Sequence, residues 1–538
     1  MEKKLIFAVI LIVFSLSGCT FDMDLRNDND PDTKRVLVTP EDVEGLISSA
    51  FREYWFAVNG YYPGNGLSVI GDEMACHWGN WAIRNLIWEP RKEWNNSPSY
   101  GYRSFNEDPW YNNYHVISNV NDALYWILEG NEFGTPGSMD TKRAEVFGKF
   151  CRALSLGYIG LFFDRGVIIS EKIDLQHYDP VFVEYDKLVD TSIEQLEECI
   201  SICRNHSFTL PSTWINGLTI TNEDLIKLCH SFIARYMVLG SRNTAERASV
   251  DWNSVLDYIA LGITEDFAPE GDNEDWWHPL QYCSCWNGWF TASNRLIGPS
   301  DMSGRYSEWL NTYVNDRYPT PIESPDRRIT GDITGLTDGK WFSYMPRFHT
   351  TPHYDTYNSR YRPRKFDYQY PEAYGPMPHL TLTEMDMLKA EAYLRGIDGT
   401  KADAAGLINK TRVLNGEMEP LTGDESDLEL WKWMCYEKRM ETQMTGIAFF
   451  DYRGWAGLMI DGEKVVHMPE GTPVHFPVPG KELEILMEDN YSFGGAGQPY
   501  TTPSIYGAGN VIDIEYIKKA RERIDRHNKS KHAIPVRR

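Results

Sequence analysis

Apolar residues recur at helical spacing in several separate stretches, and this pattern constrains the fold more than any other feature of the chain. In the first stretch Thr39 can cap a helix, Pro40 suits its first position, and Asp42 completes a capping-box spacing. The apolar face that follows consists of Val43, Leu46, Ile47, Ala50 and Phe51. The same periodicity predicts helices over 143–163, 185–203, 224–239 and 252–261.

A helical hairpin is the clearest supersecondary unit. Residues 383–395 carry a helical stripe that Gly396 ends, and residues 401–414 form the next helix, which ends at Asn415-Gly416. Alanines at 390, 392, 402, 404 and 405 allow the two helices to pack closely. We therefore predict a mainly α fold built on a scaffold of tetratricopeptide-like helical hairpins, although no strict repeat of about 34 residues is present.

Two regions lack long helical stripes and are rich in aromatic residues. Residues 267–380 hold 6 of the 18 tryptophans and 11 of the 31 tyrosines, with turn residues throughout. Residues 60–110 hold a further set of tryptophans at 78, 81, 88, 94 and 110. Because long irregular insertions are usually functional, we expect a loop-rich, aromatic-rich second lobe carried by the helical scaffold.

The start of the chain predicts a secretory signal followed by a lipid-modified cysteine. Lys3 and Lys4 precede an apolar run over 5–16, which is shorter than the about 20 residues that span a bilayer and suits a secretory signal. Leu16-Ser17-Gly18-Cys19 follows and resembles a bacterial lipobox, so Cys19 is expected to take the acyl chains that hold the protein in a membrane. The stretch after Cys19 is polar and acidic and predicts a flexible tether.

The net charge of the chain and the placement of its cysteines limit the kinds of ligand that the protein is expected to bind. The formal net charge is −24, which argues against nucleic acid and suits a neutral ligand. Beyond Cys19 the eight remaining cysteines lie mostly at apolar helical positions, and we expect buried free thiols. No spacing typical of a zinc site is present, so we predict no metal and no cofactor.

Several motifs then resemble, in order, those of the SusD/RagB family of nutrient-binding lipoproteins. They lie at residues 39–51, 143–164, 388–395, 408–412, 437–455 and 476–482. The stretch 388–395 is close to the Ala-Glu-Ala-Tyr signature, and Ile408-Asn409-Lys410-Thr411-Arg412 is close to Ile-Asn-x-x-Arg. Asp164 stands where the family usually has glycine. Arg439, Glu441, Asp451 and Arg453 in the stretch 437–455 predict a network of paired charges that holds the fold.

The resemblance implies a division of the chain and a role. The expected parts are a signal peptide (1–18), a lipidated cysteine with an acidic tether (19–38), an N-terminal helical region (39–266), an aromatic-rich lobe (267–380) and a C-terminal helical region (381–538). Family members sit on the outer membrane, face the cell exterior and deliver glycan, or in some cases peptide, to a SusC-like TonB-dependent transporter. The resemblance therefore implies a non-catalytic protein that captures oligosaccharide.

Candidate ligand-binding residues come from two aromatic stretches and one further segment. Sugar rings need flat apolar surfaces and planar polar groups, which tryptophan, tyrosine, asparagine and arginine supply. The candidates are Trp78, Asn80, Trp81, Arg84, Trp276, Trp286, Asn287, Trp289, Trp341 and Tyr344. His77 and His278 are expected to satisfy local hydrogen bonds rather than bind metal.

Three alternatives stay open, and one of them is a mainly structural lid that binds no ligand measurably without the transporter. A peptide-binding uptake protein would present an extended groove with free backbone hydrogen bonds, whereas a glycan binder would present exposed rings. A lipoprotein glycoside hydrolase would need two carboxylates at a defined separation inside the aromatic region. No hydrolase, metalloprotease or phosphate-loop motif is present in the sequence.

Overall fold

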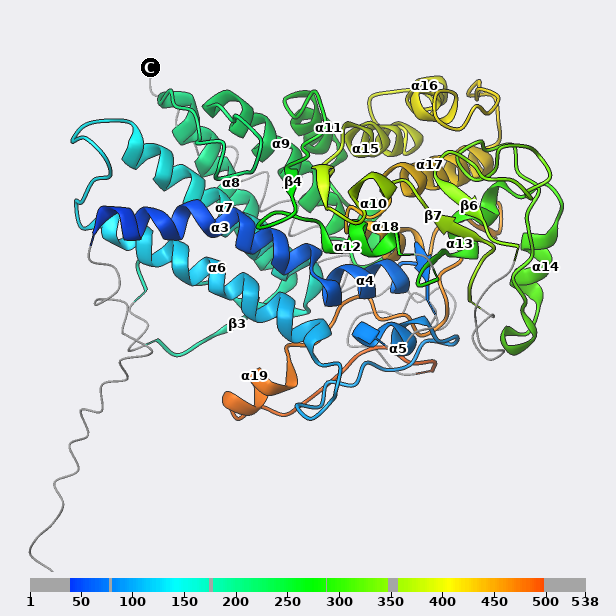
Figure 1. Ribbon diagram of the computed structural model, residues 1–538, viewed down its shortest axis with the longest axis horizontal. Coiled ribbons are helices and arrows are strands. Elements are labelled where there is room, and N and C mark those ends of the chain that lie inside the picture. Colours follow the sequence, from blue (N-terminus) through cyan, green and yellow to red (C-terminus); the bar gives the residue numbers. More distant parts are fainter. Residues whose placement is uncertain (1–38, 77–79, 174–177, 287, 347–356, 498–538) are drawn as a thin grey trace, which may run out of the picture.

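The computed structural model describes residues 39–76, 80–173, 178–286, 288–346 and 357–497. Within these residues the fold is mainly helical, with 17 α-helices and only short strands, as the sequence predicted. Figure 1 shows the long helices gathered on one side and a region of short elements and loops on the other. None of the helices in this part of the chain is long and apolar enough to cross a membrane.

Long helices packed one on the next build the first half of the scaffold. They are α3 (Pro40–Asn59), α6 (Ser104–Leu128), α7 (Asp140–Phe162), α8 (Tyr185–Asn205), α9 (Asn222–Leu239) and α11 (Trp252–Ala260). Helix α7 packs against both α6 and α8, and α8 packs against α9. The predicted capping box begins α3, because the Thr39 side chain accepts a hydrogen bond from the Asp42 N–H while Asp42 accepts one from the Thr39 N–H.

The second half of the scaffold contains the predicted hairpin. It comprises α15 (Leu382–Leu394), α16 (Lys401–Arg412), α17 (Asp427–Glu441) and α18 (Ala448–Trp455), joined to the first half by contacts of α15 with α9 and α11. Gly396 ends the first helix of the hairpin at φ 76°, a conformation that favours glycine. Helix α10 (Thr244–Ala248) lies against α18.

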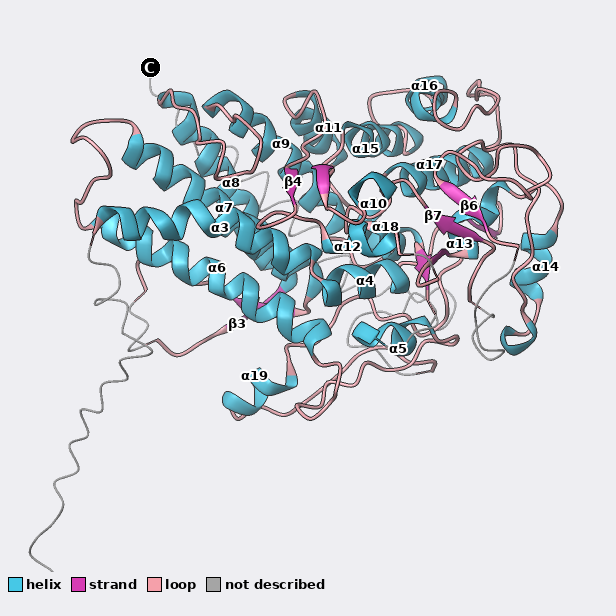
Figure 2. Cartoon of the chain, viewed as in Figure 1, coloured by secondary structure: helices cyan, strands magenta, loops and turns pink. Residues whose placement is uncertain are grey.

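The remaining elements are short. The helices are α4 (Tyr61–Ile70), α5 (Ile83–Ile87), α12 (Pro279–Ser284), α13 (Asn294–Ile297), α14 (Arg305–Asn311) and α19 (Gly480–Ile485). Five antiparallel strand pairs complete the fold (Figure 2): β1 (Met74–Ala75) with β5 (Thr291–Ala292), β2 (Arg165–Val167) with β3 (Phe182–Glu184), β4 (Glu270–Asp272) with β8 (Tyr374–Pro376), β6 (Phe342–Tyr344) with β7 (Tyr361–Pro363), and β9 (Met459–Ile460) with β10 (Glu463–Lys464).

The region 60–110 is more regular than the sequence suggested. It holds α4, whose sequence contains a proline and two glycines, and the start of α6, which has Pro109 inside it. A Cβ added at Gly66 would lie 2.3 Å from the Phe105 ring, so this glycine lets α4 and α6 approach closely. Composition argued against a helix here, and tertiary packing overrides it.

Buried ion pairs join the two halves of the scaffold. Arg247 of α10 donates to Glu391 of α15 at 2.7 Å and to Asp451 of α18 at 2.8 Å, and Lys438 reaches Asp451 at 2.8 Å. Burial would raise the pKa of Glu391, but Arg247 and its neighbours lower it to about 2.

The prediction that the charged residues Arg439, Glu441, Asp451 and Arg453 pair with one another is wrong. Asp451 pairs with Arg247 and Lys438, and Glu441 pairs with Arg328. Arg439 and Arg453 donate to backbone carbonyls instead, for example Arg453 to those of Leu161 and Val474. All these side chains are buried, so the network holds the fold as expected but reaches far beyond its own segment.

All eight cysteines beyond Cys19 are buried free thiols, which confirms the prediction.

Candidate functional site: an aromatic platform

Six aromatic rings from two distant parts of the chain form one continuous surface, which we call the aromatic platform. Its members are Tyr61, Trp81, Trp277, Tyr282, Trp286 and Trp289, and each is half-buried. Tyr61 and Trp81 stack with ring centroids 4.9 Å apart and planes 7° apart. Trp81 lies 5.5 Å from Trp289, and Trp289 lies 5.0 Å from Trp286.

The other two members, Trp277 and Tyr282, connect Tyr61 to Trp286. Trp277 lies 5.4 Å from Tyr61, and Tyr282 lies 5.6 Å from Trp277 and 6.0 Å from Trp286. The segment after β7 adds exposed tyrosines, of which Tyr370 lies 5.4 Å from Tyr282 and is 50% exposed. The contacts among the six rings therefore close into one compact cluster, with Tyr370 at its edge.

A short strand pair brings the two sequence regions together. Strand β1 pairs with β5, with Met74 opposite Ala292 and Ala75 opposite Thr291. Trp81 follows β1 and Trp286 and Trp289 precede β5, so the antiparallel pairing sets their loops side by side. Helix α12 packs against α4 and adds Tyr282 beside Tyr61.

The backbone at Trp81 is held in an uncommon conformation. Trp81 has φ 51° and ψ 35°, and Ala82 has φ 64° and ψ 0°, both in the left-handed region. Such a conformation costs of order 1–3 kcal/mol for a non-glycine residue and persists only where the surroundings enforce it. Here it accompanies the stacking of the Trp81 ring on Tyr61, and it marks this position as a candidate for function.

A small apolar cluster fixes the platform from below. Val69, Met74, Cys76, Leu280 and Phe290 are among its buried members, and Tyr61, Trp81, Trp286 and Trp289 pack on them from the outside. These four rings are thereby anchored on the core while part of each remains accessible. Rings anchored in this way lose little further conformational freedom when they bind a ligand.

Charged side chains border the rings as arginine–carboxylate pairs. Arg362 binds Asp367 through two contacts, at 2.8 and 2.7 Å, and also donates to the carbonyl of Cys285, the residue before Trp286. On the other side Arg52 reaches Asp275, two residues before Trp277, at 3.0 Å. Planar groups of this kind are suited to hydroxyl-rich ligands.

The titratable groups of the platform stay neutral near pH 7. Burial raises the pKa of Tyr61 to about 12, and burial also raises the pKa of Tyr282. Beneath the platform, burial lowers the pKa of His278 to about 3. The His278 ring caps α12 by accepting a hydrogen bond from the Gln281 N–H, in agreement with its predicted local role.

The predicted site residues divide into four groups. Trp81, Trp286 and Trp289 meet in the platform, with Asn80 exposed beside Trp81 and Arg84 half-buried in α5. Trp78 and Asn287, like Cys19 and His77, lie outside the described residues.

Trp276 does not belong to the surface. It is only 5% exposed and packs in the core, 6.2 Å from Phe51 and 6.3 Å from Trp55. The structure thus places the neighbouring Trp277, which the sequence analysis passed over, in the platform.

Trp341 and Tyr344 lie in another part of the lobe. Lys365 and Arg328 lie over the Trp341 ring at 4.2 and 5.5 Å, and Tyr344 lies 6.0 Å from Tyr361. Both pack on a separate apolar cluster that shares no ring with the platform.

Sequence reasoning missed Tyr61, Trp277 and Tyr282 of the platform and Tyr370 at its edge. Tyr282 stands four residues before Trp286, a helical spacing that could have found it. Tyr61 and Tyr370 carry no such signal, because only the fold brings them to the other rings.

In the part of the chain that the structure describes, no group of three or more His, Cys, Asp or Glu side chains is placed to hold a metal ion. The absence of a bound metal or cofactor stays a prediction from the sequence.

Comparison with known proteins supports the fold assignment. No family model matches the chain, and no curated protein is similar to it in sequence. Among solved structures, a SusD superfamily protein from Bacteroides thetaiotaomicron is 15% identical, with 83% of this chain and 98% of that chain covered at a TM-score of 0.52.

Two further SusD superfamily proteins give the same result. One from Parabacteroides distasonis is 14% identical, with coverage of 83% and 97% and a TM-score of 0.57. One from Bacteroides vulgatus is 13% identical, with coverage of 83% and 97% and a TM-score of 0.52. The fold that the sequence motifs implied is therefore confirmed, and this chain has a SusD-like fold.

Proposed function

We propose that this protein captures oligosaccharide at the aromatic platform, without catalysing a reaction, and passes it to a SusC-like TonB-dependent transporter. The observation that carries the proposal is the platform of half-buried rings Tyr61, Trp81, Trp277, Tyr282, Trp286 and Trp289. Sugars stack their C–H faces on such rings and bond their hydroxyls to the bordering charged pairs.

The location follows from the sequence. Lipid attached at Cys19 holds the protein in the outer membrane, with the tether (19–38) between the lipid and the first helix and the fold facing the cell exterior. In this role the helical scaffold supports the platform and offers a broad face to the transporter. Replacement of Cys19 by alanine is expected to move the protein from the membrane fraction to the soluble fraction, and continued retention would contradict the anchor.

Two observations favour glycan over the alternatives. A peptide groove would expose strand edges, whereas the strand pair β1–β5 beside the platform is only two residues long on each side and is buried. The carboxylates at its border, Asp275 and Asp367, are each paired with an arginine, unlike the acid pair of a glycoside hydrolase.

Calorimetric titration of residues 20–538 against plant, host and microbial oligosaccharides tests the proposal, with peptides as controls and chromatography of the products. We expect binding to one glycan class without cleavage. Replacing Trp81 or Trp286 by alanine should weaken binding by about tenfold or more, because a central aromatic residue contributes at least about 1.4 kcal/mol.

Trp341→Ala is the matched control, since it removes another half-buried tryptophan outside the platform. Equal losses in all three variants would contradict a site at the platform. Cleavage of the glycan would contradict a capture role, and binding of peptide alone would favour the peptide-uptake alternative.

A further inference from the structure

A cavity lies away from the platform, between α14, α17 and the segment that follows β10. Its volume is about 830 Å³, within the range of about 300–1,000 Å³ that small-ligand sites occupy. Tyr306 and Leu310 line it from α14, Trp433 and Tyr436 from α17, and Tyr452 from α18. It shares no lining residue with the aromatic platform, and we call it the α14–α17 cleft.

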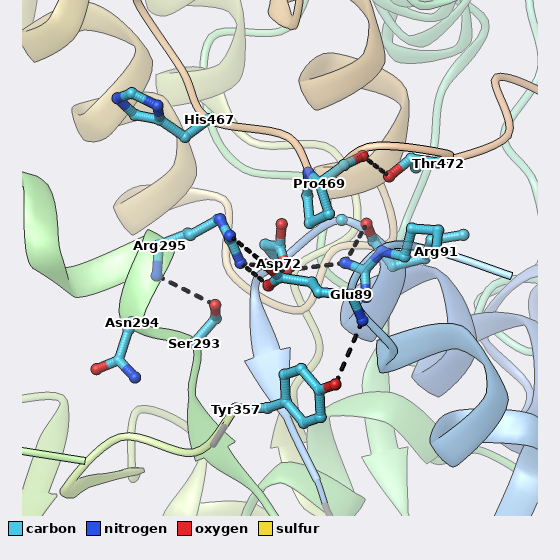
Figure 3. Close-up of polar contacts among 12 residues, drawn as sticks. Asp72, Glu89, Arg91, Ser293, Asn294, Arg295, Tyr357, His467, Pro469 and Thr472 are labelled. Carbon is cyan, nitrogen blue, oxygen red and sulfur yellow. Dashed lines mark hydrogen bonds and ion pairs between the residues drawn. The ribbon is translucent and has the colours of Figure 1, made fainter. Parts of the chain in front are cut away.

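A clamped ionic network forms one wall of the cleft (Figure 3). Arg295 holds Glu89 through two contacts, at 2.5 and 2.9 Å, and Arg317 holds the same carboxylate at 2.7 Å. The network continues behind Glu89, where Arg91 pairs with Asp72 at 2.9 Å. Burial would raise the pKa of Glu89, but the arginines around it lower the value to about 2.

The network makes the wall rigid. The guanidinium of Arg295 lies over Trp309 at 5.1 Å, and that of Arg317 lies over the same ring at 4.3 Å. Arg439 donates to the backbone carbonyls of Arg295 and Asp72 at 2.9 and 2.7 Å, which ties the wall to α17. A wall fixed in this way lowers the entropy cost of binding.

The charge of the cleft is nearly balanced, unlike that of the whole chain. Its lining residues include the cations Arg295, Arg439, Lys432 and Lys464 and the anions Glu89, Asp301, Glu429, Glu463 and Glu470. Desolvation, together with Arg295, Lys464 and Lys432, lowers the pKa of His467 to about 4, so this residue adds no charge at neutral pH. The chain as a whole carries −24.

Such a lining selects the chemistry of the ligand. A free anion would meet five acids and a free cation four bases, so neither gains a net attraction. Aromatic walls with fixed planar polar groups suit a neutral, hydroxyl-rich molecule instead. The half-enclosed space favours a short ligand over a long chain, in contrast to the surface of the platform.

We propose that the α14–α17 cleft is a second carbohydrate site, which takes a neutral mono-, di- or trisaccharide independently of the platform. The proposal rests on the proposed glycan-capture function only for its class of ligand, which is carbohydrate. The residues that form the two sites are different. The protein would then hold a long glycan on the platform and a short one, or a chain end, in the cleft.

The test is calorimetry with neutral disaccharides built from glucose, mannose, galactose or xylose. To separate the two sites, the measurement is made in the wild-type chain and in a Trp81→Ala/Trp286→Ala background that weakens the platform. We expect a disaccharide that still binds in that background, with at least tenfold loss when Ser307→Trp is added. Ser307 is exposed on α14 at the mouth of the cleft, so a tryptophan there would block entry without removing a core contact.

Ser201→Trp is the matched control. Ser201 is exposed on α8 and, like Ser307, its carbonyl accepts a hydrogen bond from an asparagine four residues later. Both variants should melt close to the wild-type temperature, and only Ser307→Trp should lose cleft binding.

The outcomes separate the two proposals. Loss of all disaccharide binding in the Trp81→Ala/Trp286→Ala background would overturn the cleft site and leave the platform standing. Disaccharide binding that Ser307→Trp does not change would also overturn it. Tighter binding of a uronic acid disaccharide or a dipeptide than of every neutral disaccharide would overturn the assigned ligand class.

Discussion

The helical scaffold and the aromatic platform use the same residue types in opposite ways. In the scaffold Trp55 and Trp455 are fully buried, each with its indole N–H bonded inside the protein. In the platform Trp81, Trp286 and Trp289 are half-buried and pack on one another. Burial, and not residue type, therefore separates rings that hold the fold from rings that are available to a ligand.

The two regions also differ in how their charges are held. Arg247, Glu391 and Asp451 are buried in the scaffold, so breaking one contact strands a charge in a medium that solvates it poorly. Arg362 with Asp367 and Arg52 with Asp275 lie beside the platform, where water reaches at least one partner. Substitutions should accordingly affect stability in the first region and binding in the second.

The largest expected effect is on the buried scaffold network. Arg247→Ala should destabilise the protein by about 3–5 kcal/mol, because Glu391 and Asp451 would lose their shared partner. Thermal melting of the variant and the wild-type protein measures this loss of stability. Lys401→Ala, which breaks an exposed pair with Asp427, is the control and should cost at most about 1 kcal/mol. Similar shifts for the two variants would remove the distinction between the regions.

Acid should weaken the fold before it changes the chemistry of the platform. The pKa values of Glu89 and Glu391 are lowered in the folded protein from 4.5 to about 2. A depressed folded-state pKa stabilises the protein above the unfolded value, and this stability is lost as pH falls from about 4.5 to about 2. Between pH 6 and 9 binding should be constant, since the Tyr61 pKa is about 12. Thermal melting at a series of pH values tests the loss of stability in acid, and calorimetric titration at the same pH values tests the constancy of binding. A change in affinity near pH 7 would contradict the expectation of constant binding.

Close packing of α4 against α6 should give a smaller effect. Gly66→Ala places a Cβ 2.3 Å from the Phe105 ring and should cost about 1–3 kcal/mol through overpacking of α4 against α6. Gly406→Ala in α16 is the matched control, because nothing lies within 4 Å of its added Cβ. A helical alanine there should stabilise the protein by up to about 1 kcal/mol. Melting temperatures that move in the same direction would contradict this account of Gly66.

The smallest expected effect is at the edge of the aromatic platform. Tyr370→Ala should weaken glycan binding by only about two- to fivefold, because this ring is 50% exposed and touches the platform through Tyr282 alone among its members. Tyr313→Ala, at another exposed tyrosine, should leave affinity unchanged. A loss at Tyr370 as large as that at Trp81 would move the centre of the site toward the tyrosine-rich edge.

Local signals in the sequence predicted much of the scaffold. The stripes of α7, α8, α9, α15 and α16 gave helices whose ends agree with the structure to within about three residues, and the capping box gave the start of α3. The end of α3 at Asn59 lies well beyond Phe51, where its predicted apolar face stopped. The same signals failed for α4 and α6, where a proline and glycines argued against helix. Their stability comes from contacts that sequence spacing does not reveal, such as the fit of Gly66 against Phe105.

The sequence by itself determined the helical scaffold, the free buried thiols and three of the platform tryptophans, because caps, apolar periodicity and neighbouring glycines act over a few residues. The tertiary structure decided which rings meet. Trp276 and Trp277 are adjacent, yet one faces Phe51 in the core and the other faces Tyr61 in the platform. The pairing of β1 with β5 joins loops about 200 residues apart, and no local pattern specifies that contact. Binding surfaces of this kind depend on long-range packing, so their members are known only once the chain has folded.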